Sequence, residues 1–104
     1  GERNEAGEAE GRGVCRYPDG AVYDGEWKAD KKEGRGVYRF ADGVVDSCFY
    51  KQSAPVGEGV RWLADGQRAW RLRNWHRVEE ISLEEARQTA ERLGLPLPSP
   101  LPGA

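Results

Sequence analysis

The sequence has little of the chemistry by which enzymes and metal proteins are recognised. It holds two cysteines, Cys15 and Cys48, and one histidine, His76. Two cysteines are too few for a disulfide scaffold and lack the Cys-x-x-Cys spacing of zinc and redox sites, so we interpret them as reduced thiols that fill space in a sheet. One histidine with two cysteines does not make a structural zinc site. We therefore expect no metal, no cofactor and no enzyme activity.

Long apolar runs and an excess of positive charge are also missing. No stretch of 18 or more apolar residues occurs, so no transmembrane helix is predicted. Residues 1–10 are polar and have no apolar core of a signal peptide, although a targeting segment removed earlier stays open. The net charge is -2, which argues against a nucleic-acid partner because such binding relies on positive charge. We expect an intracellular protein, cytoplasmic or organellar, associated with the cytoskeleton or a membrane complex.

Glycine and aromatic residues are abundant, and they recur with a period of 23 residues. The motif Gly-x-Gly-Val begins at Gly11, Gly34 and Gly57, and an Asp-Gly pair follows each copy at the same distance. Asp-Gly is a strong hairpin signal because glycine tolerates the positive φ of the turn. The period therefore predicts three antiparallel hairpins. Their strands are expected at residues 13–17 and 21–27, 36–40 and 44–50, and 59–63 and 67–72.

One face of the predicted sheet collects rings and glycines, because side chains alternate between the two faces of a strand. A glycine beside a large ring leaves room for that ring to lie flat over the backbone. Rings then stack from one hairpin to the next, while the opposite face is expected to be mostly solvated. We predict that six rings line a groove for a helix or extended segment of a partner: Tyr17, Tyr23, Trp27, Tyr38, Phe40 and Tyr50.

These residues resemble the MORN (membrane occupation and recognition nexus) repeat family. Its pattern is an aromatic residue, Gly and a second aromatic residue, then Gly-x-Gly and a terminal Asp-Gly turn. Residues 23–27, 34–38 and 42–43 match this pattern, whereas Asp46 stands where an aromatic residue is expected and Cys48 where Gly is expected. The resemblance covers residues 11–66. It implies an elongated single-layer antiparallel sheet that serves as a binding platform.

The third hairpin is predicted to end the array as a cap. Its apolar residues Trp62, Trp70 and Leu72 have the strand parity opposite to Leu63 and Ala69. A terminal repeat has no next neighbour to cover it. We therefore expect this hairpin to offer its other face to a later segment of the chain.

That later segment is predicted to be a helix over residues 83–93. Ser82 and Glu85 form a capping box, and Gly94 is placed to end the helix. A helix of this length is marginal alone, so we expect it to dock on the sheet. The expected contact joins Ile81, Leu83, Ala90 and Leu93 to Trp62, Trp70 and Leu72.

We divide the chain into four segments. They are a flexible acidic lead-in at 1–10, the repeat sheet at 11–77 with units starting at 11, 34 and 57, the capping helix at 78–94, and a Pro-rich tail at 95–104. The tail holds four of the six prolines, which favours an extended conformation. We expect it to lie off the folded sheet as an attachment arm, so that its deletion leaves the sheet folded.

Residues 67–77 carry four arginines and two tryptophans without an acidic residue. This composition suits anionic lipid or single-stranded nucleic acid, a solvated edge strand, or anchors for a protein partner. We favour the last interpretation and add Trp70 and Trp75 to the predicted partner-binding residues.

The predicted function is a non-enzymatic protein–protein interaction or scaffolding module, a small structural subunit of a larger assembly. The alternative is a peripheral membrane module that binds anionic phospholipids. Its candidate residues are Lys28, Lys31 and Lys32, placed in a loop between the first two hairpins, and Arg68, Arg71, Arg73 and Arg77. An accessory repeat domain of an enzyme stays open as a third possibility.

Overall fold

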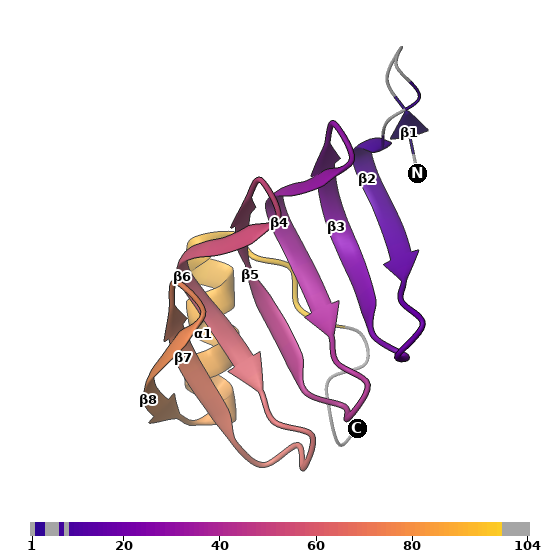
Figure 1. The fold of residues 1–104 in the computed structure, drawn as a ribbon. Helices are drawn as coiled ribbons and strands as arrows, with labels where there is room; N and C mark the ends of the chain where they lie inside the picture. The colour runs from indigo at the N-terminus through magenta and orange to yellow at the C-terminus, as the bar shows by residue number, and fades with distance from the viewer. Residues whose placement is uncertain (1, 4–6, 8, 99–104) are drawn as a thin grey trace.

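A computed structural model describes residues 2–3, 7 and 9–98, which form one antiparallel sheet and one helix (Figure 1). The strands lie side by side in chain order. Their bounds are β1 Glu2–Arg3, β2 Ala9–Arg16, β3 Val22–Lys28, β4 Lys31–Arg39, β5 Val45–Lys51, β6 Ala54–Trp62, β7 Ala69–Arg73 and β8 His76–Ile81, followed by α1 Leu83–Leu93. The predicted mainly-β fold, a single-layer sheet of repeat hairpins with a C-terminal helix, is confirmed.

The connections between strands are short at both ends of the sheet. In each Asp-Gly turn the aspartate side chain accepts a hydrogen bond of 2.9–3.1 Å from the backbone N–H two residues later. Successive hairpins are joined by two residues, both at positive φ, such as Ala29 (51°) and Asp30 (66°). The loop expected between the first two hairpins is therefore absent from the described chain. Lys28 ends β3, and Lys31 and Lys32 begin β4.

The third hairpin differs from the first two by one residue. Five residues separate the strands at 17–21 and 40–44, but six separate them at 63–68. One extra residue turns every side chain of the following strand to the other face. Ala69 therefore pairs with Trp62, and Trp70 pairs with Arg61. The prediction that Trp62, Trp70 and Leu72 share one face is wrong.

Helix α1 packs on β6 and β7 and lies behind the sheet in Figure 1. Its ends follow the prediction, since Ser82 Oγ accepts from the Glu85 N–H at 3.0 Å and Gly94 has a φ of 72°. The core between helix and sheet contains Val60, Trp62, Ala69, Ile81, Ala86, Ala90 and Leu95, with Phe49 and Leu93 beside them. The predicted contact is confirmed for Ile81, Ala90 and Leu93 with Trp62. It is wrong for Trp70 and Leu72, which lie on the other face of the sheet, and for Leu83, whose side chain stays 42% exposed.

The segments on either side of the predicted repeat sheet contribute to the fold. Part of the lead-in forms β1 and the start of β2, and residues 1, 4–6 and 8 lie outside the described chain. At the other end Leu95 is buried in the helix core, and Ser47 Oγ donates to the Pro96 carbonyl at 2.7 Å. Residues 95–98 therefore pack on the sheet instead of lying off it, and residues 99–104 lie outside the described chain. Residues 76–81, for which no strand was predicted, form β8.

Candidate functional site

A row of small residues crosses the sheet on the face away from α1. Gly13, Gly25 and Gly36 are register partners on β2, β3 and β4, and Cys48 continues the row on β5. The Tyr23 ring lies over this row. A Cβ placed on Gly36 would lie 2.5 Å from Tyr23 Cε1 and 2.6 Å from Cζ. The predicted packing of rings over glycine is confirmed, and it buries Tyr23 completely.

Around Tyr23 the rings form a contiguous aromatic cluster. The centroid of the Tyr23 ring lies 5.1 Å from that of Trp27 and 5.2 Å from that of Tyr50, and both pairs meet edge to face. The rings of Tyr17 and Tyr38 lie 5.8 Å apart and extend the cluster. Burial raises the pKa of these phenols, in the case of Tyr17 to about 12, so the cluster carries no negative charge at neutral pH.

Lys32 enters this cluster from the start of β4. Its Nζ lies 5.0–5.6 Å from the ring centroids of Tyr17, Tyr23, Tyr38 and Tyr50. Burial lowers the pKa of the Lys32 amine. Within the described residues no carboxylate pairs with this amine, so the faces of four rings are its principal electrostatic surroundings.

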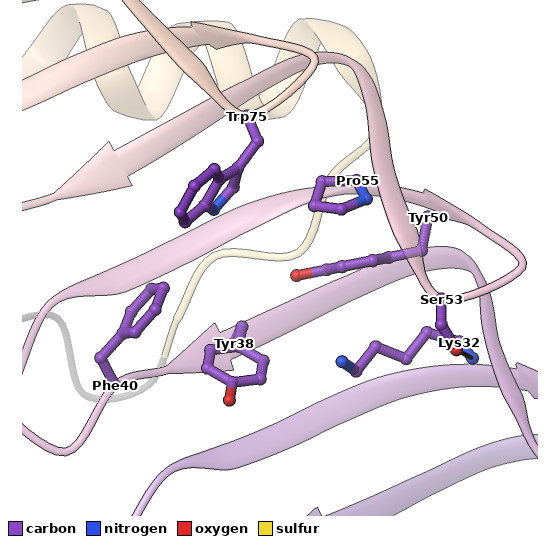
Figure 2. A pocket seen from close by; sticks show the side chains of 7 residues that line it. All are labelled: Lys32, Tyr38, Phe40, Tyr50, Ser53, Pro55 and Trp75. Carbon is purple, nitrogen blue, oxygen red and sulfur yellow. Dashed lines mark hydrogen bonds between the residues drawn. The ribbon is translucent and has the colours of Figure 1, made fainter.

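A groove of about 350 Å³ opens beside the cluster, on the same face (Figure 2). Trp75 and Phe40 stand at one end of it, Tyr50 and Lys32 at the other, and Tyr38 lies between them. Its lining consists of Lys32, Tyr38, Phe40, Tyr50, Ser53, Pro55 and Trp75. The groove is thus mostly aromatic and contains one charged residue.

A buried ion pair holds one wall of the groove. The Asp46 carboxylate accepts from Arg61 Nε at 2.7 Å and from Arg61 Nη2 at 2.9 Å, and it also accepts from Trp75 Nε1 at 3.1 Å. The Arg61 guanidinium lies 5.1 Å from the Trp75 ring centroid and 5.8 Å from that of Phe40. Asp46, which departs from the repeat pattern, therefore positions an aromatic side chain from the distant β7–β8 turn.

The structure separates the eight predicted partner-binding residues into two groups. Four of them line the groove: Tyr38, Phe40, Tyr50 and Trp75. The others lie outside it. Tyr17 packs on Tyr38, Tyr23 is buried, Trp27 donates to the Gly13 carbonyl at 3.0 Å, and the ring of Trp70 lies 4.9 Å from the Arg77 guanidinium.

Three groove residues were not predicted as partner-binding: Lys32, Ser53 and Pro55. Strand parity contained a signal for Lys32, because it lies an even number of positions before Tyr38 on the same strand and therefore shares its face. The signal was hidden by placing Lys32 in a loop.

The seven predicted lipid-binding residues do not gather on one surface. Lys28 and Lys31 flank the β3–β4 turn, and the β6–β7 turn lies at the opposite ends of the strands (Figure 1). Arg68 belongs to the β6–β7 turn and pairs with Asp65 at 2.9 Å. Arg71 and Arg73 share the face that α1 packs on, as their register partners on β6 show. Arg77 lies over Trp70, and Lys32 lies among the tyrosines.

In the described part of the chain no group of three or more His, Cys, Asp or Glu side chains is arranged to hold a metal ion. Cys15 and Cys48 are free thiols, and burial raises the pKa of Cys48 to about 11. No described helix has both the length and the apolar character needed to cross a membrane.

Comparison with known proteins gives one result for the sheet. The family model for the MORN repeat matches residues 5–22, 23–45 and 49–68, which together make up more than half of the chain. No curated protein matches. The matched segments include strands β2, β3, β4 and β6 and both ends of β5, and therefore Gly13, Gly25, Gly36, the tyrosines and Lys32, whereas residues 46–48 lie between two matched segments.

Proposed function

Since the chain belongs to the MORN repeat family, whose repeats mediate protein or membrane interactions, we propose that it is a non-enzymatic scaffolding module. It binds a helix or an extended segment of a partner protein on its aromatic face, as a small structural subunit of a larger assembly. The observation that carries this proposal is the groove lined by Tyr38, Phe40, Tyr50 and Trp75.

The groove is organised before a partner arrives. Trp75 is 47% exposed, yet its indole is held by the hydrogen bond to Asp46 and its ring lies against Arg61. Rigid aromatic side chains lose little conformational entropy on binding, and such residues dominate the energetics of interfaces. On the other face, α1 already packs on β6 and β7, and Ser47 of β5 donates a hydrogen bond to the Pro96 carbonyl.

The test compares recovery of partner proteins by the wild-type chain and by single variants, after purification from the native source and mass spectrometry. Tyr38→Ala and Trp75→Ala are each expected to weaken binding by about 2 kcal/mol or more, the cost of truncating a buried aromatic anchor. Trp70→Ala is the matched control, because Trp70 is an aromatic residue of the same face outside the groove. Recovery of partner proteins by Tyr38→Ala and Trp75→Ala that equals recovery by Trp70→Ala and by the wild-type chain would show the proposal to be wrong.

A peripheral membrane module has less support, because the basic candidates lie at both ends and on both faces of the sheet. Flotation with vesicles of neutral and of anionic phospholipid checks it. Binding to anionic vesicles that is lost in Lys28→Gln and Arg68→Gln together would restore this alternative, since each cation near such a surface contributes about 1 kcal/mol.

A further inference from the structure

We propose that the groove recognises an acidic–apolar segment of the partner, in which an Asp or Glu carboxylate pairs with Lys32 and a neighbouring apolar side chain packs on Phe40 and Trp75. This inference rests on the proposed function and names the chemistry of the segment that the groove selects.

The Lys32 cation has ring faces around it but no counter-ion among the described residues. Its Nζ lies 5.0 Å from the Tyr38 centroid and 5.4 Å from that of Tyr23, and no carboxylate of the described chain pairs with it. Ring faces offset only part of the loss of water around an ammonium group. A carboxylate that enters the groove supplies the missing negative charge and a charge-assisted hydrogen bond.

A second cation near the groove is already neutralised, which leaves Lys32 as the point of recognition. Arg61 makes two hydrogen bonds to Asp46, whose side chain is 1% exposed. The groove lining itself contains Lys32 and no acidic residue. The groove therefore has a local positive charge, although the whole chain has a net charge of -2.

The rest of the lining specifies what stands beside the carboxylate. Phe40 and Trp75 present rings at the end of the groove away from Lys32 (Figure 2). An aromatic or aliphatic side chain fits this end because it buries apolar surface there. A phosphate group suits the site less well, since its two charges favour several donors in a fixed arrangement and the lining offers one cation.

The proposal is tested with peptides selected on the full chain from a phage-displayed random library. We expect the selected peptides to share an Asp or Glu next to an aromatic or aliphatic residue. Synthetic peptides with Glu and with Gln at that position are then compared by fluorescence polarisation. The Glu peptide is expected to bind about tenfold more tightly, as a charge-assisted contact does relative to a neutral one.

Two substitutions locate the contact on the protein. Lys32→Met keeps the apolar stem in place and is expected to weaken the Glu peptide about tenfold while leaving the Gln peptide unchanged. Lys31→Met removes the same charge from the adjacent residue, which is exposed, and is expected to leave both peptides unchanged. If Lys32→Met does not fold, raising the salt from about 50 mM to about 500 mM must weaken the Glu peptide selectively on the wild-type chain.

The outcomes separate this inference from the proposed function. Peptides that lose binding in Tyr38→Ala but carry no acidic residue, and tolerate Lys32→Met, leave the groove as the binding site and overturn the role of Lys32. Peptides insensitive to both Tyr38→Ala and Trp75→Ala overturn the proposed function and this inference together. A library that yields no specific binder would likewise overturn both the proposed function and this inference.

Discussion

Replacing Gly36 by alanine tests the packing on which the whole aromatic face depends. The new Cβ would lie within 2.6 Å of Tyr23 Cε1 and Cζ, so the ring must move. Overpacking a filled site costs about 1–3 kcal/mol. Moving the ring also breaks the 3.0 Å hydrogen bond from Tyr23 Oη to the Glu26 carbonyl, worth about 0.5–1.5 kcal/mol. We expect Gly36→Ala to lower the free energy of unfolding by about 2–4 kcal/mol in total.

Urea unfolding followed by tryptophan fluorescence measures this loss. The matched control is the same substitution in a Tyr23→Leu background, because leucine keeps apolar volume but lacks the ring atoms that the new Cβ would meet. There Gly36→Ala is expected to cost less than half as much. A cost below about 0.5 kcal/mol in the wild-type chain, or an equal cost in both backgrounds, would refute the argument that the glycine makes room for the ring.

Three further predictions concern other parts of the fold. Asp46→Asn is expected to lower the free energy of unfolding by about 2–3 kcal/mol, since it weakens a pair whose acidic member is buried; an unchanged urea midpoint would contradict this. Leu95→Ala is expected to cost about 2–4 kcal/mol because Leu95 belongs to the helix core, and thermal unfolding that matches wild type would show that the start of the tail is dispensable. At pH 8 iodoacetamide is expected to modify Cys15 before Cys48, because burial raises the pKa of Cys48 to about 11, and equal alkylation rates in mass spectra would contradict this. Since the folded state holds the Cys48 proton more tightly than the unfolded state, the contribution of Cys48 to the free energy of unfolding falls as the pH rises above about 9.

The repeats and the helix were predictable because their signals are local. An Asp-Gly pair needs only its own side chain and a positive φ to form the turn, and Ser82 with Gly94 sets both ends of α1 within a few residues. The packing of Tyr23 over glycine also followed from spacing, since residues of like parity on paired strands share a face. For these features the residues that interact lie within the same short sequence motif that predicts them.

Features that depend on register were not predictable in the same way. The third hairpin keeps the repeat spacing of its Asp-Gly pair, but its strands are separated by one more residue, which turned Trp70 and Leu72 away from α1. The accompanying difference in hydrogen bonding is small. The Leu63 N–H donates to the carbonyl five residues later, that of Arg68, whereas the equivalent bonds of the first two hairpins span four residues. The shifted register buries Ala69 against the helix, and that contact exists only once α1 has docked.

The sequence by itself therefore determined the hairpins, the aromatic face and the capping helix, because turn chemistry, strand alternation and capping act between near neighbours. Only the tertiary structure decided the binding groove. It combines Lys32 and Tyr38 of β4 with Trp75 of a turn more than 30 residues later. Their meeting depends on the pairing of β4 to β8 in register and on the buried pair of Asp46 and Arg61, whose partners lie 15 residues apart in sequence and on adjacent strands. No local pattern encodes such a contact, since its free energy is gained only when all of these strands have paired in register.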